Sequence, residues 1–163
     1  MKNFPYLCIM NPKLFILIGP PLSGKDTYLK DNLQGAEIIS RDDILMSLVD
    51  HNDYSKAFKT VDQKIVDKLL KDKIDVSIAS YQDVVINTTN LSKKGRKKFL
   101  QKFPSHYMKT AVVFPKLDME TYIQRNLKRQ TEDNKFIPIK VIEDMIIRWE
   151  EASLDEGFDN IIN

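Results

Sequence analysis

Short apolar runs alternate along the chain with segments whose apolar residues recur every three or four positions. The runs at 14–18, 36–39, 84–86 and 110–114 predict short buried strands. Helices are expected after residue 25, at 44–49, from about 55 onward, at about 92–103 and at about 118–129. Strands that are separated by helices favour a parallel sheet covered on both faces. The pattern therefore predicts an α/β fold.

Two of the expected helices have a clear apolar face. The helix that begins near Ser55 is expected to be long and to bury one side in the core. Its apolar positions at helical spacing are Phe58, Val61, Ile65 and Leu69. A last helix is expected to begin at Pro138, because proline fits the first turn of a helix. Its apolar positions are Val141, Ile142, Met145, Ile146 and Trp149.

The segment between the first strand and the first helix has the spacing GxxxxGK of a phosphate-binding loop. Its glycines allow backbone N–H groups to turn inward around phosphate oxygens, and Lys25 can reach the β and γ phosphates. The start of the following helix adds partial positive charge. The loop predicts binding of a nucleoside triphosphate, ATP in our interpretation. Its residues are Gly19, Pro20, Pro21, Leu22, Ser23, Gly24, Lys25, Asp26 and Thr27.

One position departs from the usual phosphate loop. The residue after the lysine is normally Ser or Thr, whose hydroxyl meets Mg²⁺, whereas this chain has Asp26 followed by Thr27. Asp26 could hold Mg²⁺ directly or through water, since Mg²⁺ prefers oxygen ligands. Alternatively, its carboxylate only stabilises the start of the helix. We take Asp26 and Thr27 as the candidate metal contacts.

Ligands in parallel α/β sheets bind beyond the carboxyl ends of the strands. This rule brings the loop at 19–27 together with residues 40–43 and 87–90. Asp42, which follows the second strand, is predicted to be the general base that accepts a hydroxyl proton. The alternative is that Asp42 and its neighbour Asp43 cap a helix. Arg41, Thr88 and Asn90 are expected to contact the acceptor substrate.

Two arginines lie four residues apart on a predicted helix. Arg125 and Arg129 therefore share one face, and the polar stretch 130–135 follows them. This pattern predicts a lid at about 125–138 that closes over a triphosphate and excludes water. An exposed arginine pair is also common on helices without a function. Because the chain also contains a phosphate loop, we favour the interpretation as a lid.

Composition limits the classes of protein that the chain can belong to. A length of 163 residues with 42% hydrophobic and 29% charged residues predicts a single globular domain over 1–163. The net charge of +2 is too small to indicate nucleic-acid binding by itself. The single cysteine, Cys8, and the lack of an apolar run that could span a bilayer favour a cytoplasmic protein. With so few soft ligands, structural zinc is not expected.

The densest positive cluster has two interpretations. It could guide a nucleic-acid backbone, or it could be the solvated face of a helix whose Phe99, Leu100 and Phe103 point inward. The second interpretation is favoured. The cluster comprises Lys93, Lys94, Arg96, Lys97 and Lys98.

The order of these motifs resembles the kinase domain of phage-type polynucleotide 5′-kinases, a branch of the P-loop kinases. The matching stretches are 19–27, 40–43, 85–92, 113–114, 124–129 and 137–139. The resemblance implies a P-loop kinase fold, with a central parallel sheet and a small helical lid. It also implies that Asp42 is the general base and that Arg125 and Arg129 are lid arginines on the donor phosphates.

The chain departs from that family at three places. An arginine that binds the acceptor phosphate is usual three residues after the catalytic aspartate, where this chain has Leu45. The stretch 87–90 lacks the aspartate often found there, and Asp26 replaces the usual hydroxyl residue. The donor machinery therefore resembles the family more closely than acceptor recognition does.

The sequence favours an ATP-dependent, Mg²⁺-assisted kinase that acts on the 5′-hydroxyl of RNA or DNA. Lys25 and the loop amides would hold the phosphates, and Asp42 would take the proton. Two alternatives stay open. One is a kinase for a small metabolite or nucleoside, and the other is a nucleotide-dependent binding module without catalysis.

Overall fold

A computed structural model describes residues 10–133 and 135–163. Its strands are β1 (Lys13–Ile18), β2 (Glu37–Ile39), β3 (Val84–Ile86), β4 (Met108–Val113) and β5 (Asn160–Ile162). Its α-helices are α1 (Lys25–Asn32), α2 (Arg41–Ser47), α3 (Tyr54–Thr60), α4 (Gln63–Ala79), α5 (Lys93–Lys102), α6 (Met119–Asp133) and α7 (Ile139–Ile147). A short 3₁₀ helix, η1, spans Leu154–Glu156.

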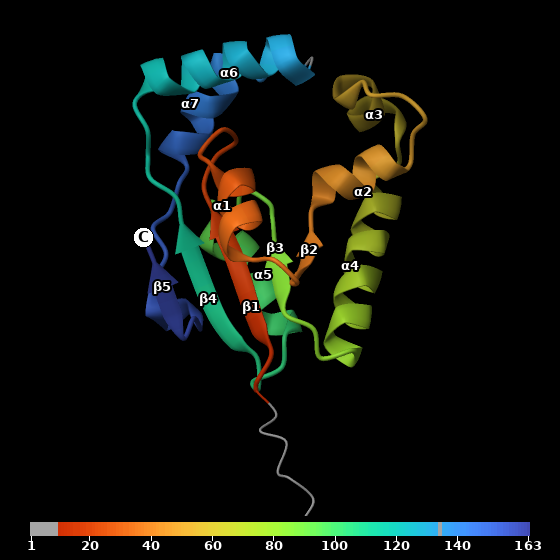
Figure 1. The fold of residues 1–163 in the computed structure, drawn as a ribbon, viewed down its shortest axis with the longest axis vertical. Coiled ribbons are helices and arrows are strands. Elements are labelled where there is room, and N and C mark those ends of the chain that lie inside the picture. The colour runs from red at the N-terminus through yellow and green to blue at the C-terminus, as the bar shows by residue number, and fades with distance from the viewer. Residues whose placement is uncertain (1–9, 134) are drawn as a thin grey trace, which may run out of the picture.

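The five strands form one parallel sheet in the order β2-β3-β1-β4-β5. The central strand β1 pairs with β3 from Leu14 opposite Val84 to Ile16 opposite Ile86. Its other edge pairs with β4 along its whole length. The carboxyl ends of the strands therefore meet at one edge, below α6 in Figure 1. The expected α/β fold with a central parallel sheet is confirmed.

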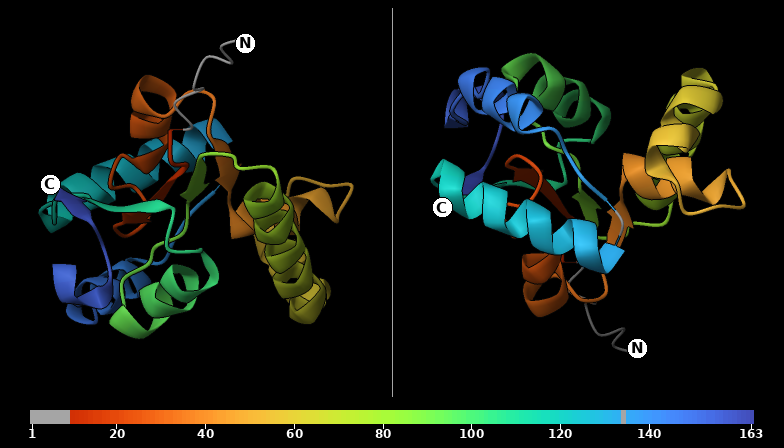
Figure 2. Two further views of the ribbon diagram at one scale, coloured as in Figure 1. Left: turned by 90° about the horizontal axis from the view of Figure 1, so that it is seen from below. Right: turned by 90° about the horizontal axis from the view of Figure 1, so that it is seen from above.

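Alternate residues of β1 point to opposite faces of the sheet, and each face has its own helices. Leu14 and Ile16 belong to the larger core cluster, which includes residues of α4 and α5. Leu17 belongs to a smaller cluster that contains Leu29 of α1. Figure 2 shows α1 on one side of the sheet and α5 on the other. The strands thus hold the segments that follow them in fixed positions.

The expected long helix from about residue 55 is wrong, because the chain forms two helices there. The side chain of Asp62 accepts a hydrogen bond from the N–H of Lys64 and starts a new helix, α4. The buried face of α4 begins at Val66, while Phe58 and Ile65 are about half exposed, at 50% and 49%. Of the predicted positions, Val61 and Leu69 pack against the core. The fully buried face of α4 instead consists of Val66, Leu70, Ile74 and Ser77.

Three further expectations need correction or restriction. Strand β5 was not expected, and it pairs with β4 at the edge of the sheet. Helix α6 runs to Asp133, so most of the polar stretch 130–135 is helical. Cys8 and Asn134, on which the compartment and part of the lid depend, lie outside the described residues. Among the described residues, no helix has the length and apolar character needed to cross a membrane.

Candidate active site

The loop between β1 and α1 turns tightly where the sequence predicts phosphate binding. Gly24 has φ 102° and Leu22 has φ 68°, so both residues adopt the left-handed conformation. A Cβ atom at Gly19 would lie only 2.8 Å from Ser23 Oγ and 2.9 Å from Phe114 Cβ. Gly19 is therefore needed for close packing, and Gly24 for the backbone conformation that starts the helix.

Lys25 is the first residue of α1, and its side chain reaches back to the start of the loop. Its Nζ donates hydrogen bonds to the carbonyl oxygens of Gly19 at 2.8 Å and Pro20 at 2.7 Å. Burial lowers the pKa of Lys25 to about 8, against the opposing charges of Asp26 and Asp42, and Arg129 lowers it further. The amino group of Lys25 is thus held against the loop backbone in a desolvated position. A bound anion would favour its protonated, charged form.

The donor set of the loop fits a triphosphate. Within the described residues, the N–H groups of Leu22, Ser23 and Gly24 form no backbone hydrogen bond, and the first N–H groups of α1 lack helical partners. Ser23 Oγ is also buried without a hydrogen-bond partner among the described residues. Anion-binding donors and a buried cation therefore converge at the start of α1, as phosphate binding requires.

Asp26 lies in the first turn of α1, where its carboxylate is exposed. Its Oδ1 atom accepts a hydrogen bond of 3.4 Å from Asn87 Nδ2, beyond the end of β3. Thr27 is exposed beside it. The described residues contain no group of three or more His, Cys, Asp or Glu side chains that could hold a metal ion. A Mg²⁺ ion at Asp26 or Thr27 would therefore depend mainly on phosphate oxygens and water.

Asp42 lies in the first turn of α2, which begins directly after β2. The cap of α2 is Ser40, whose Oγ accepts the N–H of Asp43 at 3.2 Å. The capping alternative for Asp42 and Asp43 is therefore wrong. Asp42 is exposed, and its Oδ1 accepts a hydrogen bond of 2.8 Å from the hydroxyl of Tyr54 on α3.

Tyr54 was not singled out from the sequence, although it contacts the candidate base. Burial raises the pKa of Tyr54 to about 12, and its hydrogen bond to Asp42 acts in the same direction. Tyr54 therefore stays protonated as a donor at neutral pH. The charges of Asp42 and Arg129 also act on Tyr54, so α2, α3 and α6 approach one another here. No local signal in the sequence linked residues twelve positions apart.

The three expected acceptor contacts differ in their surroundings. Arg41 points to α4, with Nη2 at 2.7 Å from Gln63 Oε1 and 3.2 Å from Asp67 Oδ1. Asn90 is only 7% exposed, and its amide donates to the carbonyl of Leu17 at 2.7 Å. Its own side-chain oxygen accepts from Thr88 Oγ1 at 2.7 Å. Thr88 and Asn90 thus bond to each other, and Asn90 ties this segment to the end of β1.

The segment after β3 also contacts the phosphate loop. The N–H of Gly19 donates to the carbonyl oxygen of Thr89 at 3.0 Å. The structure therefore brings two of the three expected segments into direct contact. The third, 40–43, is close enough for the charge of Asp42 to act on Lys25. The loop and the segment after β3 therefore meet, and the place of 40–43 in the same site stays a prediction.

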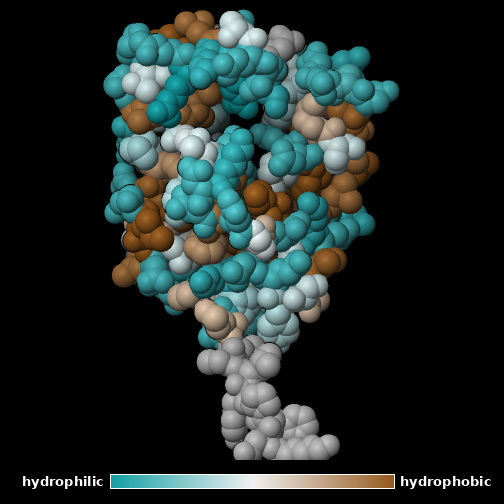
Figure 3. Space-filling view, viewed as in Figure 1, coloured by the Kyte–Doolittle hydropathy of each residue, from teal (hydrophilic) through white to brown (hydrophobic). Residues whose placement is uncertain are grey.

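Helix α6 crosses above the carboxyl ends of the strands (Figure 1). Arg125 Nη1 donates a hydrogen bond of 2.8 Å to the carbonyl oxygen of Leu22, so Arg125 reaches the phosphate loop. Arg129, one turn later, is half-buried, and its charge acts on Lys25. Figure 3 shows hydrophilic residues over α6 and a hollow in the surface beneath it. Arg125 thus contacts the loop, and the charge of Arg129 acts on it.

The expected basic cluster is not a uniform surface, because Arg96 is fully buried. Its Nε and Nη2 atoms each lie 2.8 Å from a carboxylate oxygen of Glu156. Its Nη1 donates to the carbonyl oxygens of Asn90, Leu91 and Glu150. Leu100 and Phe103 are buried, as the solvated-helix interpretation expected. The exposed cations of α5 are Lys93, Lys94, Lys97, Lys98 and Lys102.

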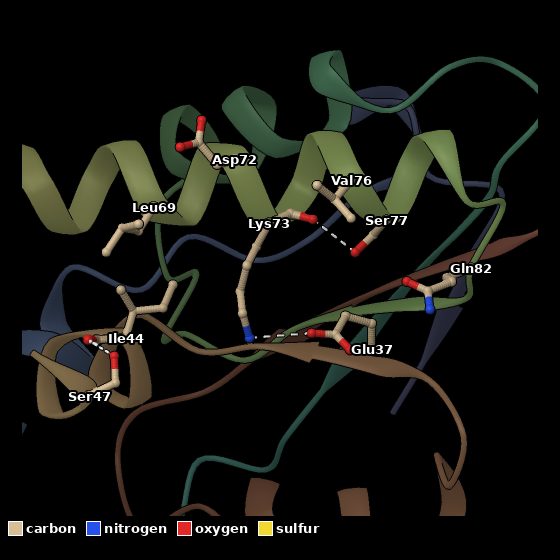
Figure 4. A pocket seen from close by; sticks show the side chains of 9 residues that line it. All are labelled: Glu37, Ile44, Ser47, Leu69, Asp72, Lys73, Val76, Ser77 and Gln82. Carbon is tan, nitrogen blue, oxygen red and sulfur yellow. Dashed lines mark hydrogen bonds and ion pairs between the residues drawn. The ribbon is translucent and has the colours of Figure 1, made fainter.

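An apolar surface pocket lies away from the phosphate loop, between α2, α4 and β2. Its volume is about 540 Å³, and the ion pair of Lys73 Nζ and Glu37 Oε1, at 3.3 Å, crosses it (Figure 4). Ile44, Leu69 and Val76 form its apolar walls. Residues of the phosphate loop do not line it. The pocket is therefore not part of the candidate active site.

Comparisons with known proteins agree with the fold. The AAA_33 family, described as an AAA domain, matches residues 14–152. No curated protein matches the chain. A chain of the Pnkp1/Rnl/Hen1 RNA repair complex is similar in structure, with a TM-score of 0.69 and 24% identity. The match covers 90% of this chain and 46% of that one, so this chain spans less than half of its length.

Two other similar structures are not described as RNA repair proteins. A gluconokinase from Sinorhizobium meliloti 1021 has a TM-score of 0.54 and 14% identity, over 93% of this chain and 81% of that one. Chaetomium thermophilum Kti12 in complex with ADP-AlF3 has a TM-score of 0.51 and 17% identity, over 92% and 88%. At such identities these likenesses show a shared fold alone.

Proposed function

The chain belongs to the AAA_33 family and has a P-loop kinase-like fold, and we propose from this premise that it is an ATP-dependent polynucleotide 5′-kinase. Its acceptor in this proposal is the 5′-hydroxyl of RNA or DNA, as the resemblance of its motifs implies. The domain would extend over 1–163, with α6 as part of the lid. A cytoplasmic location belongs to the same proposal.

The residues divide the work of phosphoryl transfer in the following way. Bound ATP with Mg²⁺ would supply the γ-phosphoryl group and offset its charge. Lys25 and the N–H groups of the loop would hold phosphate oxygens, and Asp26 and Thr27 would face the metal. Asp42 would take the proton of the acceptor hydroxyl. The hydroxyl oxygen would then form a bond to the γ-phosphorus, and the bond from that phosphorus to ADP would break. Arg125 and Arg129 would offset the charge that develops.

One observation carries this assignment. A carboxylate that is hydrogen-bonded at 2.8 Å to a neutral tyrosine acts electrostatically on the lysine of a phosphate-binding loop. A base and a phosphate-binding cation at the same edge of a parallel sheet are the two groups that hydroxyl phosphorylation needs. Arg125, hydrogen-bonded to the loop, supports the same interpretation.

A specific observation favours a second candidate, a kinase for a small metabolite or nucleoside. Leu45, where the resembling family has its acceptor arginine, is fully buried in the core. A longer cationic side chain would not fit there without displacing its neighbours. The usual contact to an acceptor phosphate is therefore missing at this position, as a small acceptor without a phosphate would allow.

The test is transfer from radiolabelled ATP to a panel of 5′-hydroxyl oligonucleotides, nucleosides and sugars. The proposal expects labelled oligonucleotides, with label lost in Lys25→Ala. Label on nucleosides or sugars alone would select the metabolite kinase. Tight ATP binding without transfer to any acceptor would select the binding module.

A further inference from the structure

Helix α3 presents two aromatic rings beside the candidate base. Tyr54 and Phe58 lie one helical turn apart, with ring centroids 6.2 Å apart and planes inclined by 26°. Phe58 is 50% exposed, and the helix buries only Ala57 completely. About half of the Phe58 ring is therefore available for contact with a ligand.

The hydroxyl of Tyr54 fixes the position of this pair relative to the chemistry. It donates to Asp42 Oδ1 at 2.8 Å, so the ring of Tyr54 cannot move away from the carboxylate while this bond is kept. Phe58 continues the aromatic surface from Tyr54 toward solvent. An acceptor whose hydroxyl meets Asp42 would therefore have its neighbouring atoms close to these rings.

The charges of α3 indicate which acceptor would use the rings. Lys56 and Lys59 are exposed on the same helix, and α3 has no acidic residue in its first turn. A flat ring on a helix that also carries exposed cations complements a nucleobase with an adjoining phosphate. Leu45, in contrast, offers the acceptor no polar contact, because its side chain is apolar and also buried.

We propose that Tyr54 and Phe58 form an aromatic platform that stacks on the base of the 5′-terminal nucleotide of the acceptor. This inference rests on the proposed function, because it names how that same site recognises its substrate. The platform takes the place of the missing acceptor arginine. Tyr54 also positions Asp42, since its hydroxyl holds one carboxylate oxygen in place.

The test measures binding without turnover. A 5′-hydroxyl oligonucleotide with 2-aminopurine as its first base loses fluorescence when that base stacks, and it is titrated with each protein in the absence of ATP. Phe58→Leu should weaken binding by about 5- to 150-fold, the range expected for loss of one base–aromatic stack. Phe58→Trp should retain the quenching.

The chain offers a matched control. Tyr81 is 64% exposed, and its ring centroid lies 5.3 Å from that of His106. It lies between the end of α4 and the start of β3, whereas the candidate site lies beyond the carboxyl ends of the strands. Tyr81→Leu should therefore bind and quench like the wild type. Thermal unfolding of all variants checks that they fold.

Measurements of binding and of phosphoryl transfer together distinguish failure of the platform from failure of the proposed kinase activity. Equal affinity and quenching for wild type and Phe58→Leu would overturn the platform, even if the wild type labels oligonucleotides. Quenching that depends on Phe58, without transfer to any 5′-hydroxyl, would support the platform and overturn the kinase. A wild type that does not bind the oligonucleotide but labels sugars would overturn both.

Discussion

Arg96 and Glu156, sixty residues apart in sequence, form a two-pronged ion pair in the interior. The guanidinium is fully buried, and the carboxylate side chain is 8% exposed. The same guanidinium donates hydrogen bonds to the carbonyl oxygen of Asn90, which follows β3, and to that of Glu151, which follows α7. This pair therefore ties the segment after β3 to the chain after α7.

Glu156→Gln should destabilise the protein by about 3–5 kcal/mol, because removal of one partner leaves a buried charge uncompensated. Urea unfolding followed by circular dichroism measures the change. Lys97→Gln, on the exposed face of the same helix, is the control and should change stability by less than about 0.5 kcal/mol. Equal stabilities for Glu156→Gln and the control would contradict the structural role of the pair.

The pair should also make the protein sensitive to acid. Burial opposes ionisation of Glu156, but hydrogen bonds from Arg96 and from the N–H of Ser153 outweigh it and lower its pKa below 4.5. A lowered pKa means that the pair contributes stability above pH 4.5, which is lost as the pH falls through the folded-state value. Unfolding free energies measured across this acid range should fall less in Glu156→Gln than in the wild type.

The apolar pattern of the sequence was sufficient for most of the fold but not for contacts between distant segments. Four strands were predicted because each coincides with a short apolar run, whereas β5 has only two apolar residues, Ile161 and Ile162, and neither of them is fully buried. Asp62 was a capping signal that the continuing apolar period concealed. The burial of Arg96 depends on Glu156, which no local pattern indicates.

The candidate site also has parts that a local sequence pattern predicts and parts that depend on contacts between distant segments. The phosphate loop could be found because glycines and a lysine at fixed spacing are required by its geometry. The contact between Tyr54 and Asp42 could not, because it depends on how α3 returns toward α2. The roles given to the site residues stay predictions that the following experiments test.

Binding of ATP should take up protons at about pH 8.5. Burial lowers the pKa of Lys25 to about 8, so much of the free protein has a neutral lysine there, and bound phosphate would favour the charged form. Calorimetric titrations in two buffers of different ionisation enthalpy measure the uptake. It should shrink below pH 8 and be absent in Lys25→Met. Unchanged uptake in Lys25→Met would assign the proton to another group.

Asp42→Asn should keep ATP binding and lose turnover by about 10²–10⁴-fold, since an amide cannot accept the proton of the acceptor. Asp43→Asn should cost much less, because the cap of α2 uses the backbone N–H of Asp43. Steady-state kinetics with both substrates separate the two effects. Greater sensitivity at Asp43 would reverse the assignment of the base.

Arg125→Ala and Arg129→Ala should affect turnover far more than folding. Arg125 is exposed and bonds to the loop at Leu22, and an arginine that offsets phosphoryl-transfer charge can contribute about 10³–10⁵ in rate. Loss of the exposed Arg125 side chain, in contrast, should change stability by less than about 0.5 kcal/mol.

Lys128 provides the control for this pair, because it lies on α6 between the two arginines and is 73% exposed. Lys128→Ala removes one positive charge from the same helix and should leave turnover nearly unchanged. If all three variants lost turnover equally, the helix would act through its net charge and not through arginines aimed at phosphate. Normal turnover in both arginine variants would make α6 a surface helix without a part in the chemistry.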